Sequence, residues 1–198
     1  MSKEALLIFV KKPEAGKVKT RLARSIGNEK ALMVYRYLLQ RTLNITRNLN
    51  QDKFVFYYPE IVENDLWSVE GYRKRLQADG NLGNKMMEGF NFLFEQGYDK
   101  ACVIGSDCHT LTTNILEDAF LALKQKDICV GPSEDGGYYL LGMNKLHREF
   151  FENKAWSTDR VFPETMADAE RLNLSVHRLP VLNDVDTVDD LGDLINLL

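Results

Sequence analysis

The residues of this sequence best suited to chemistry are aspartates and cationic side chains that lie far apart along the chain. Asp107 follows a short apolar run, residues 101–104, through the turn Gly105-Ser106. Open α/β sheets bind ligands at the carboxyl ends of their strands, so this carboxylate is well placed to ligate a hard divalent cation and its phosphates. The alternative is an aspartate that only tightens a turn between a strand and a helix.

A cationic segment follows the first apolar run of the chain, residues 5–10. Six of the fourteen residues from Lys11 to Arg24 are lysine or arginine, although the whole chain carries a net charge of −4. Pro13 and Gly16 mark the segment as a loop, which leads into a helix near Thr20. Such a loop can bind an anion through backbone donors, a helix N-terminus and cations, and the alternative is a solvated run of charge. The loop matches neither a Walker A motif nor a GxGxxG turn.

A second pair of carboxylates, Asp184 and Asp186, comes near the end of the chain. Side chains at alternate positions of an extended segment share one face, so both carboxylates can reach one ligand. With Asp107 and the cationic loop, they favour a diphosphate bridged by Mg²⁺ or Mn²⁺, in which carboxylates hold the ion and cations neutralise the remaining charge. Thr187 and Asp190 follow as a capping-box pattern that predicts a terminal helix with Val188, Leu191, Leu194 and Ile195 facing inward.

Two glycine-bearing segments and a tryptophan are further candidates. The turn at residues 134–137 is explained by a simple hairpin, or its glycines let a ligand approach while Asp135 contacts a substrate hydroxyl. The segment that contains Gly83 and Lys85 is either a plain turn before a helix or a second loop for a phosphate or a base. Trp156 is either a core residue or a wall of an acceptor pocket.

The hydrophobic pattern predicts the elements that position these residues. Strands are predicted over residues 5–10, 53–58, 101–104, 128–131, 138–141 and 174–179, and helices lie between most of them. Such alternation predicts a three-layer α/β/α sandwich with a mainly parallel sheet, formed as a single domain over residues 1–198. Residues 60–76 are ambiguous, and we interpret them as a helix near 64–69 and a short extended piece that begins at 75.

Composition narrows the class of protein. The net charge of −4 argues against general nucleic-acid binding. No signal peptide or membrane-spanning segment is recognised, and the three cysteines lack paired spacing, so a reduced protein in the cytoplasm is expected. Cys108 and His109 are adjacent but have no partner at the spacing of a zinc site.

Six motifs resemble, in sequence and order, the DUF2064 family of bacterial proteins. This family is described as glycosyltransferase-like or MobA-like, within the nucleotide-diphospho-sugar transferases. The motifs extend over nearly the whole chain: FVKKPEAGKVKTRLA (9–23), GNKM (83–86), GSDC (105–108), GPSEDGGYYLLG (131–142), WST (156–158) and DVDTVDDL (184–191). The patterns KxPxxGxVKTRLA and GPxxDGGYYLLG are the specific ones.

The resemblance implies a GT-A type fold, with a mostly parallel sheet that has one reversed strand and binds a nucleotide diphosphate at its carboxyl edge. It also implies that Asp107 is catalytic and ligates Mg²⁺ or Mn²⁺. Asp184 or Asp186 would supply the second contact to the metal.

The same resemblance implies how the substrates are held. Lys19 and Arg21 would hold phosphates, and Asp135, a second catalytic candidate, would line the sugar or acceptor side with the glycines that follow it. The residues implied for nucleotide or substrate binding are Lys11, Gly16, Lys19, Arg21, Gly83, Lys85, Gly136, Gly137 and Trp156.

The chain departs from the family pattern at two positions, and three functions stay open. His109 stands where the family usually has proline, and Lys85 stands where it usually has arginine. The family description favours transfer of a sugar from a nucleotide sugar to an acceptor that the sequence does not identify. The basic loop favours a nucleotidyltransferase, in which a phosphorylated acceptor attacks an NTP. The third function is nucleotide binding without catalysis.

Overall fold

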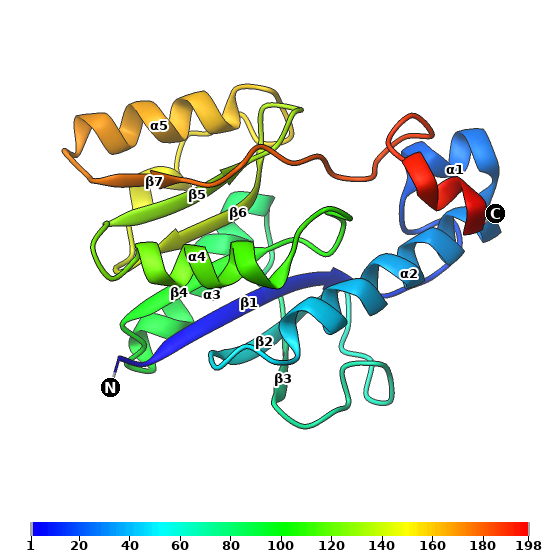
Figure 1. Cartoon of the computed structure of the whole chain (residues 1–198), viewed down its shortest axis with the longest axis horizontal. Coiled ribbons are helices and arrows are strands. Elements are labelled where there is room, and N and C mark those ends of the chain that lie inside the picture. The colour runs from blue at the N-terminus through cyan, green and yellow to red at the C-terminus, as the bar shows by residue number, and fades with distance from the viewer. Residues whose placement is uncertain (1, 198) are drawn as a thin grey trace.

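A seven-stranded sheet runs through the centre of the molecule (Figure 1). The computed structural model describes residues 2–197 and places the strands in the order β3-β2-β1-β4-β6-β5-β7. Strand β6 is antiparallel to its neighbours β4 and β5, and the other adjacent pairs are parallel. The predicted mostly parallel sheet with one reversed strand is therefore confirmed. The strands are β1 (Glu4–Lys11), β2 (Asp52–Tyr58), β3 (Tyr72–Leu76), β4 (Lys100–Ile104), β5 (Ile128–Pro132), β6 (Tyr138–Met143) and β7 (Val176–Arg178).

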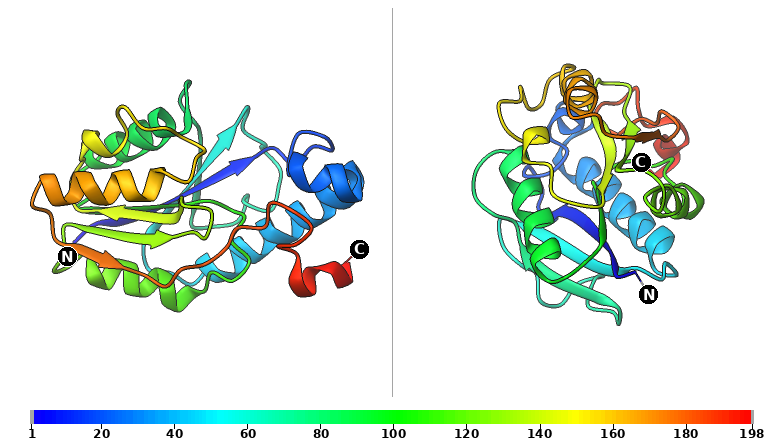
Figure 2. Two further views of the ribbon diagram at one scale, coloured as in Figure 1. Left: turned by 90° about the horizontal axis from the view of Figure 1, so that it is seen from above. Right: turned by 90° about the vertical axis from the view of Figure 1, so that its left-hand side faces the viewer.

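Helices cover both faces of this sheet, as the right-hand view of Figure 2 shows. Helices α2 and α4 pack on one face, and α3 and α5 pack on the other, so the predicted three-layer sandwich is also confirmed. None of the helices described is both long and apolar enough to span a bilayer. The helices are α1 (Thr20–Ile26), α2 (Asn28–Thr46), α3 (Leu82–Glu95), α4 (Thr113–Ala122), α5 (Val161–Arg171) and the 3₁₀ helices η1 (Arg148–Phe150) and η2 (Gly192–Leu197).

The central strand β1 divides the core into two layers. Its side chains alternate between the faces of the sheet. Leu6 and Ile8 pack against α2 and α4, whereas Ala5 and Leu7 pack against α3. All four are fully buried. This two-sided burial explains why the strand appears in the sequence as a continuous apolar run rather than as an alternating pattern.

The order of the strands determines where a ligand can bind. From β1 the chain continues to β2 on one side, whereas β4 pairs with the other side of β1 and leads on to β5 and β6. The loops after β1 and β4 therefore leave the same edge of the sheet in opposite directions and open a crevice between them. The loop after β1 is the cationic segment, and the loop after β4 begins with Gly105-Ser106-Asp107.

The helix predicted near residues 64–69 was wrong. Residues 64–69 form turns, and β3 begins earlier than expected, at Tyr72. The carboxylate of Asp65 accepts hydrogen bonds from the backbone N–H of Trp67, at 3.0 Å, and from Nζ of Lys74, at 2.8 Å. Aspartate bonds of this kind compete with the helical bonds of the backbone, and here they hold a turn that buries the Trp67 ring.

The end of the chain also differs from the prediction. The terminal helix is the short η2, which lies beside α1 and α2 in Figure 1. Leu191 and Leu194 are buried against these two helices, as expected, but Val188 and Ile195 are exposed. The chain turns at residues 187–190 before η2 begins. A side-chain network around Asp190 causes this turn and belongs to the candidate site.

Candidate active site

A cavity of about 530 Å³ lies at the carboxyl edge of β1 and β4. Its volume is in the range of small-molecule and cofactor sites. The loops after both strands, the starts of α1 and α3, and the extended segment that contains Asp184 and Asp186 contribute to its walls. Seven of the predicted site residues line this cavity: Lys11, Lys19, Arg21, Lys85, Asp107, Asp184 and Asp186.

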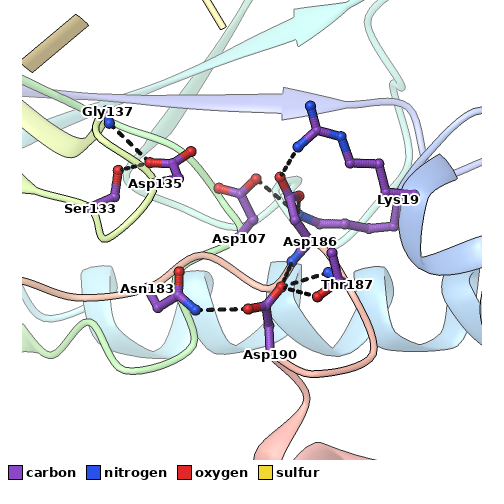
Figure 3. Close-up of polar contacts among 10 residues, drawn as sticks. Lys19, Asp107, Ser133, Asp135, Gly137, Asn183, Asp186, Thr187 and Asp190 are labelled. Carbon is purple, nitrogen blue, oxygen red and sulfur yellow. Dashed lines mark hydrogen bonds and ion pairs between the residues drawn. The ribbon is translucent and has the colours of Figure 1, made fainter. Parts of the chain in front are cut away.

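Lys19 is the centre of the charged cluster in this cavity (Figure 3). Its Nζ lies 3.0 Å from Oδ2 of Asp107 and 3.0 Å from Oδ1 of Asp186, and its side chain is only 6% exposed. Nη1 of Arg21 lies 3.6 Å from Oδ2 of Asp186. Burial alone would lower the pKa of Lys19, but the two carboxylates raise it above its ordinary value, so the ammonium is charged near neutral pH.

The backbone of Lys19 adopts an unusual conformation. Lys19 is the N-cap of α1 and has φ 45° and ψ 46°, in the left-handed region that non-glycine residues rarely adopt. Strain of this kind is found preferentially at functional sites. The predicted Gly16 also has a positive φ, 76°, but it faces Asn28 rather than the cavity, so its contribution is to shape the loop.

The segment that carries Asp184 and Asp186 is hydrogen-bonded to the loop that carries Asp107. Between them, the buried Val185 donates its backbone N–H to the carbonyl oxygen of Asp107, at 3.0 Å. The two aspartates that flank Val185 both reach the cavity, as their alternate spacing predicts. Oδ1 of Asp184 is buried and has no hydrogen-bond partner within the described residues 2–197. Burial, followed by the charge of Asp107, raises the pKa of Asp184 to about 8.

These carboxylates fit a divalent cation. Asp107 and Asp186 converge on one cationic group, and the unpartnered oxygen of Asp184 lies beside them. Within residues 2–197, no three His, Cys, Asp or Glu side chains form a preassembled metal cage. Mg²⁺ is usually bound by one or two carboxylates together with waters and substrate phosphates, so a site of this kind needs no such cage.

Asp190 fixes the position of Asp186, a role that the sequence suggested only as a helix cap. Oδ2 of Asp190 accepts hydrogen bonds from the backbone N–H of Asp186, at 3.0 Å, and from the N–H and hydroxyl of Thr187, at 2.6 and 2.9 Å (Figure 3). Its Oδ1 accepts a fourth bond from Nδ2 of Asn183, at 2.8 Å. Burial would raise the pKa of Asp190, but these bonds hold it below its ordinary value.

We expect Asp190→Ala to lower the free energy of unfolding by about 2 kcal/mol. Hydrogen bonds to a charged group contribute about 1.5–3 kcal/mol each, but some of the backbone donors would form hydrogen bonds with water instead, which limits the loss. Urea denaturation measures this change. The neighbouring Asp189 is exposed and accepts no side-chain hydrogen bond among the residues described, so Asp189→Ala should stay within about 0.5 kcal/mol of the wild type. Equal stabilities of the two variants would contradict this role.

Asp135 lies beside the cavity rather than in its wall. Its Oδ1 accepts hydrogen bonds from the hydroxyl of Ser133 and from the backbone N–H of Gly137, the second of these at 3.0 Å. Figure 3 shows the carboxylate of Asp135 next to that of Asp107. Gly136 packs against the backbone of Asp159, and its carbonyl oxygen accepts the N–H of Phe162, at 2.9 Å. The turn therefore connects β5 and β6 to the start of α5.

Gly83 and Trp156 meet each other outside the cavity wall. A Cβ on Gly83 would come within 2.3 Å of Nε1 of Trp156, so the indole packs directly on the first turn of α3. Nε1 of Trp156 is buried and has no hydrogen-bond partner among the residues described. The structure therefore explains this pair by close packing and leaves one indole donor unused.

Lys85 and Lys11 form a second cationic part of the cavity. Nζ of Lys85 lies 3.6 Å from the centre of the Tyr58 ring. Burial, followed by the charge of Lys11, lowers the pKa of Lys85. His109, the other departure from the family pattern, does not line the cavity. It packs against Tyr37 of α2 instead, with the two rings tilted and their centres 5.8 Å apart.

Three tyrosines line the cavity without any functional signal in the sequence: Tyr35, Tyr138 and Tyr139. The hydroxyl of Tyr35 accepts the N–H of Lys11, at 2.8 Å, and donates to the Lys11 carbonyl oxygen, at 3.1 Å, at the point where β1 ends. The hydroxyl of Tyr138 is buried and finds no hydrogen-bond partner in the part of the chain that the structure describes. Tyr35 belongs to the apolar stripe of a helix and Tyr138 and Tyr139 to an apolar strand, so all three resemble core residues in the sequence.

Comparisons with known proteins agree with this architecture. The family model described as uncharacterized proteins conserved in bacteria, DUF2064, matches residues 36–158. No match was found among curated proteins. A crystal structure from Desulfovibrio desulfuricans G20, described as a candidate nucleotide-diphospho-sugar transferase, is 36% identical, with a TM-score of 0.90 over 98% of this chain and 87% of that chain.

Two more distant structures share the fold. The 4-diphosphocytidyl-2C-methyl-D-erythritol synthase of Anaerococcus prevotii DSM 20548 is 10% identical, with a TM-score of 0.64 over 99% of this chain and 96% of that chain. Rv0371C of Mycobacterium tuberculosis H37Rv, in complex with manganese, is 15% identical, with a TM-score of 0.55 over 98% of both chains. The chain has the fold of the nucleotide-diphospho-sugar transferases. Because the family model matches more than half of its length, residues 36–158, it belongs to the DUF2064 family.

Proposed function

We propose that the chain is a transferase that binds the nucleotide diphosphate of a nucleotide-sugar donor in this cavity and moves the sugar to an acceptor. The observation that carries the proposal is the cluster in which Lys19 contacts both Asp107 and Asp186, at the carboxyl edge of β1 and β4. The description of the 36% identical relative as a candidate nucleotide-diphospho-sugar transferase supports it.

Each charged residue has a role in this proposal. Asp107 and Asp186, with Asp184 beside them, would hold Mg²⁺ or Mn²⁺, which stabilises the negative charge of a departing diphosphate when bound. Lys19 and Arg21 would bind the phosphate oxygens. Preorganised charges of this kind can carry much of the rate of a transfer reaction without a general base. Asp135, which lies beside the cavity, would contact the sugar or the acceptor.

A second candidate function is nucleotidyl transfer, in which a phosphorylated acceptor attacks an NTP and pyrophosphate leaves. The observation that favours it is the number of cations in one cavity: Lys11 and Lys85 line it in addition to Lys19 and Arg21. A triphosphate with a phosphorylated acceptor carries more negative charge than a nucleotide sugar and needs more neutralisation. The 4-diphosphocytidyl-2C-methyl-D-erythritol synthase with the same fold is compatible with this candidate.

A thermal-shift screen of nucleoside diphosphates, triphosphates and nucleotide sugars, each with and without Mn²⁺, separates the candidates. A ligand at 100 times its dissociation constant adds about 2.7 kcal/mol of stability, which raises Tm by several degrees in a domain of this size. We expect a Mn²⁺-dependent shift with a nucleotide sugar. A shift with triphosphates alone would favour nucleotidyl transfer, and binding without turnover of any donor would favour a non-catalytic module.

A further inference from the structure

Lys19 occupies a position that a divalent cation would need. Its Nζ lies 3.0 Å from one oxygen of Asp107 and 3.0 Å from one oxygen of Asp186. Divalent cations bind carboxylate oxygens at about 2.0–2.6 Å, so an ion held by either oxygen would lie within about 6 Å of the ammonium. Two cations at this separation repel each other and compete for the same oxygen atoms, and the Lys19 side chain, at 6% exposed, is little screened by solvent.

The chemistry of lysine allows this ammonium to leave. Lysine carries a single point charge on a flexible stem with four methylene groups, whereas arginine is a rigid planar fork. The side-chain partners of Nζ within residues 2–197 are the two carboxylates, and no backbone carbonyl fixes it. The Arg21 side chain, by contrast, is 66% exposed, and its ion pair with Asp186, at 3.6 Å, is longer than the two contacts of Lys19.

We propose that Lys19 is an exchangeable counter-ion: it holds Asp107 and Asp186 together until a divalent cation takes its place, and its ammonium then moves to the phosphates of the bound nucleotide. This inference rests on the proposed function. Metal alone must separate the ammonium from two carboxylates and offers it no new partner. Metal with a diphosphate supplies that partner, so the two ligands bind cooperatively, and each strengthens the other by the same factor.

Calorimetric titration with Mn²⁺, with and without inorganic pyrophosphate as the probe, tests this exchange. For the wild type we expect weak binding of Mn²⁺ alone and at least tenfold tighter binding when pyrophosphate is saturating. Lys19→Met should bind Mn²⁺ alone about tenfold more tightly than the wild type. Pyrophosphate should strengthen that binding by a clearly smaller factor than in the wild type, because the direct contact between metal and phosphate is then the only link between the two ligands.

Lys17→Met is the matched control. It removes one positive charge from the same loop, but Lys17 is exposed and forms no ion pair among the residues described. It should therefore keep the wild-type affinity for Mn²⁺ within about twofold, together with the coupling to pyrophosphate. A gain as large in Lys17→Met as in Lys19→Met would show that net charge alone explains the effect and would overturn the exchange.

The outcomes separate this inference from the proposed function. If the wild type binds Mn²⁺ but Lys19→Met binds it no more tightly, Lys19 does not compete with the metal, and the inference alone is wrong. If neither protein binds Mn²⁺, the metal site of the proposed function is also wrong. Lys19→Gln keeps an uncharged amide donor for the carboxylates, so its affinity for Mn²⁺ should lie between those of the wild type and Lys19→Met. It replaces Lys19→Met in the test if that variant unfolds. Thermal stabilisation by Mn²⁺ gives an independent readout for all variants.

Discussion

Asp107→Asn is expected to lower the affinity for nucleotide in the presence of Mn²⁺ at least a hundredfold. The change keeps the size of the side chain but removes the charge that both a hard cation and the ammonium of Lys19 require. A hundredfold loss corresponds to about 2.8 kcal/mol, within the range for removing one partner of a charged hydrogen bond. Calorimetry with the nucleotide that gives the largest thermal shift measures it.

Two comparisons make this result specific. Without Mn²⁺, the difference between wild type and Asp107→Asn should shrink to less than tenfold, because the metal-dependent part of the affinity is then missing from both. Asp189→Asn makes the same chemical change at an exposed carboxylate near the site and should bind as the wild type does. Unchanged affinity in Asp107→Asn with Mn²⁺ present would mean that Asp107 only tightens the turn after β4.

The sequence predicted the charged cluster because topology brings it together. Once β1 and β4 are recognised as strands of a parallel sheet, the loops that follow them belong to the same edge. Asp107 and the cationic loop were therefore predictable as neighbours, and the spacing of Asp184 and Asp186 predicted a shared face. A Cβ on Gly105 would come within 2.6 Å of Oδ1 of Asp107, which explains the glycine two residues before this aspartate.

The remainder of the site depends on contacts that no local pattern encodes. Asp190 fixes Asp186 through bonds to two backbone N–H groups, and in sequence the same spacing only suggests a helix cap. The left-handed backbone of Lys19 has no signal in residue type, since lysine does not favour that region. Tyr138 looks like a core residue of a strand, because hydrophobicity does not reveal which side chains end at a cavity.

The glycine pair at residues 136–137 shows most clearly that local sequence does not reveal tertiary contacts. A pair of glycines can mean that a ligand approaches the backbone or that another segment of the chain does. At residues 136–137 the structure supplies the second explanation for Gly136, whose neighbour is the backbone of Asp159. The first glycine of the pair is therefore explained by the close packing of the β5–β6 hairpin against the start of α5. A role for Gly137 on the substrate side stays a prediction.

Gly136→Ala is accordingly expected to destabilise the fold by about 3 kcal/mol. Its φ is 84°, and a Cβ would come within 2.3 to 2.7 Å of three backbone atoms of Asp159, which cannot rotate away as a side chain can. Left-handed geometry at alanine contributes about 1–2 kcal/mol, and the overlap contributes about 1–3 kcal/mol more. In a domain of this size the loss lowers Tm by roughly 6–12 °C, which calorimetry measures.

Gly137→Ala is the matched control, one residue along the same turn. Its new Cβ would meet the side-chain oxygens of Asp135 and Ser133 at 3.2 Å, so a small shift relieves the contact. We expect a loss below about 1 kcal/mol, as for most mild substitutions. Equal losses in both variants would contradict the backbone contact at Gly136. If Gly137→Ala stays folded but loses nucleotide affinity, the second glycine faces the ligand, and the motif serves the fold through one glycine and the site through the other.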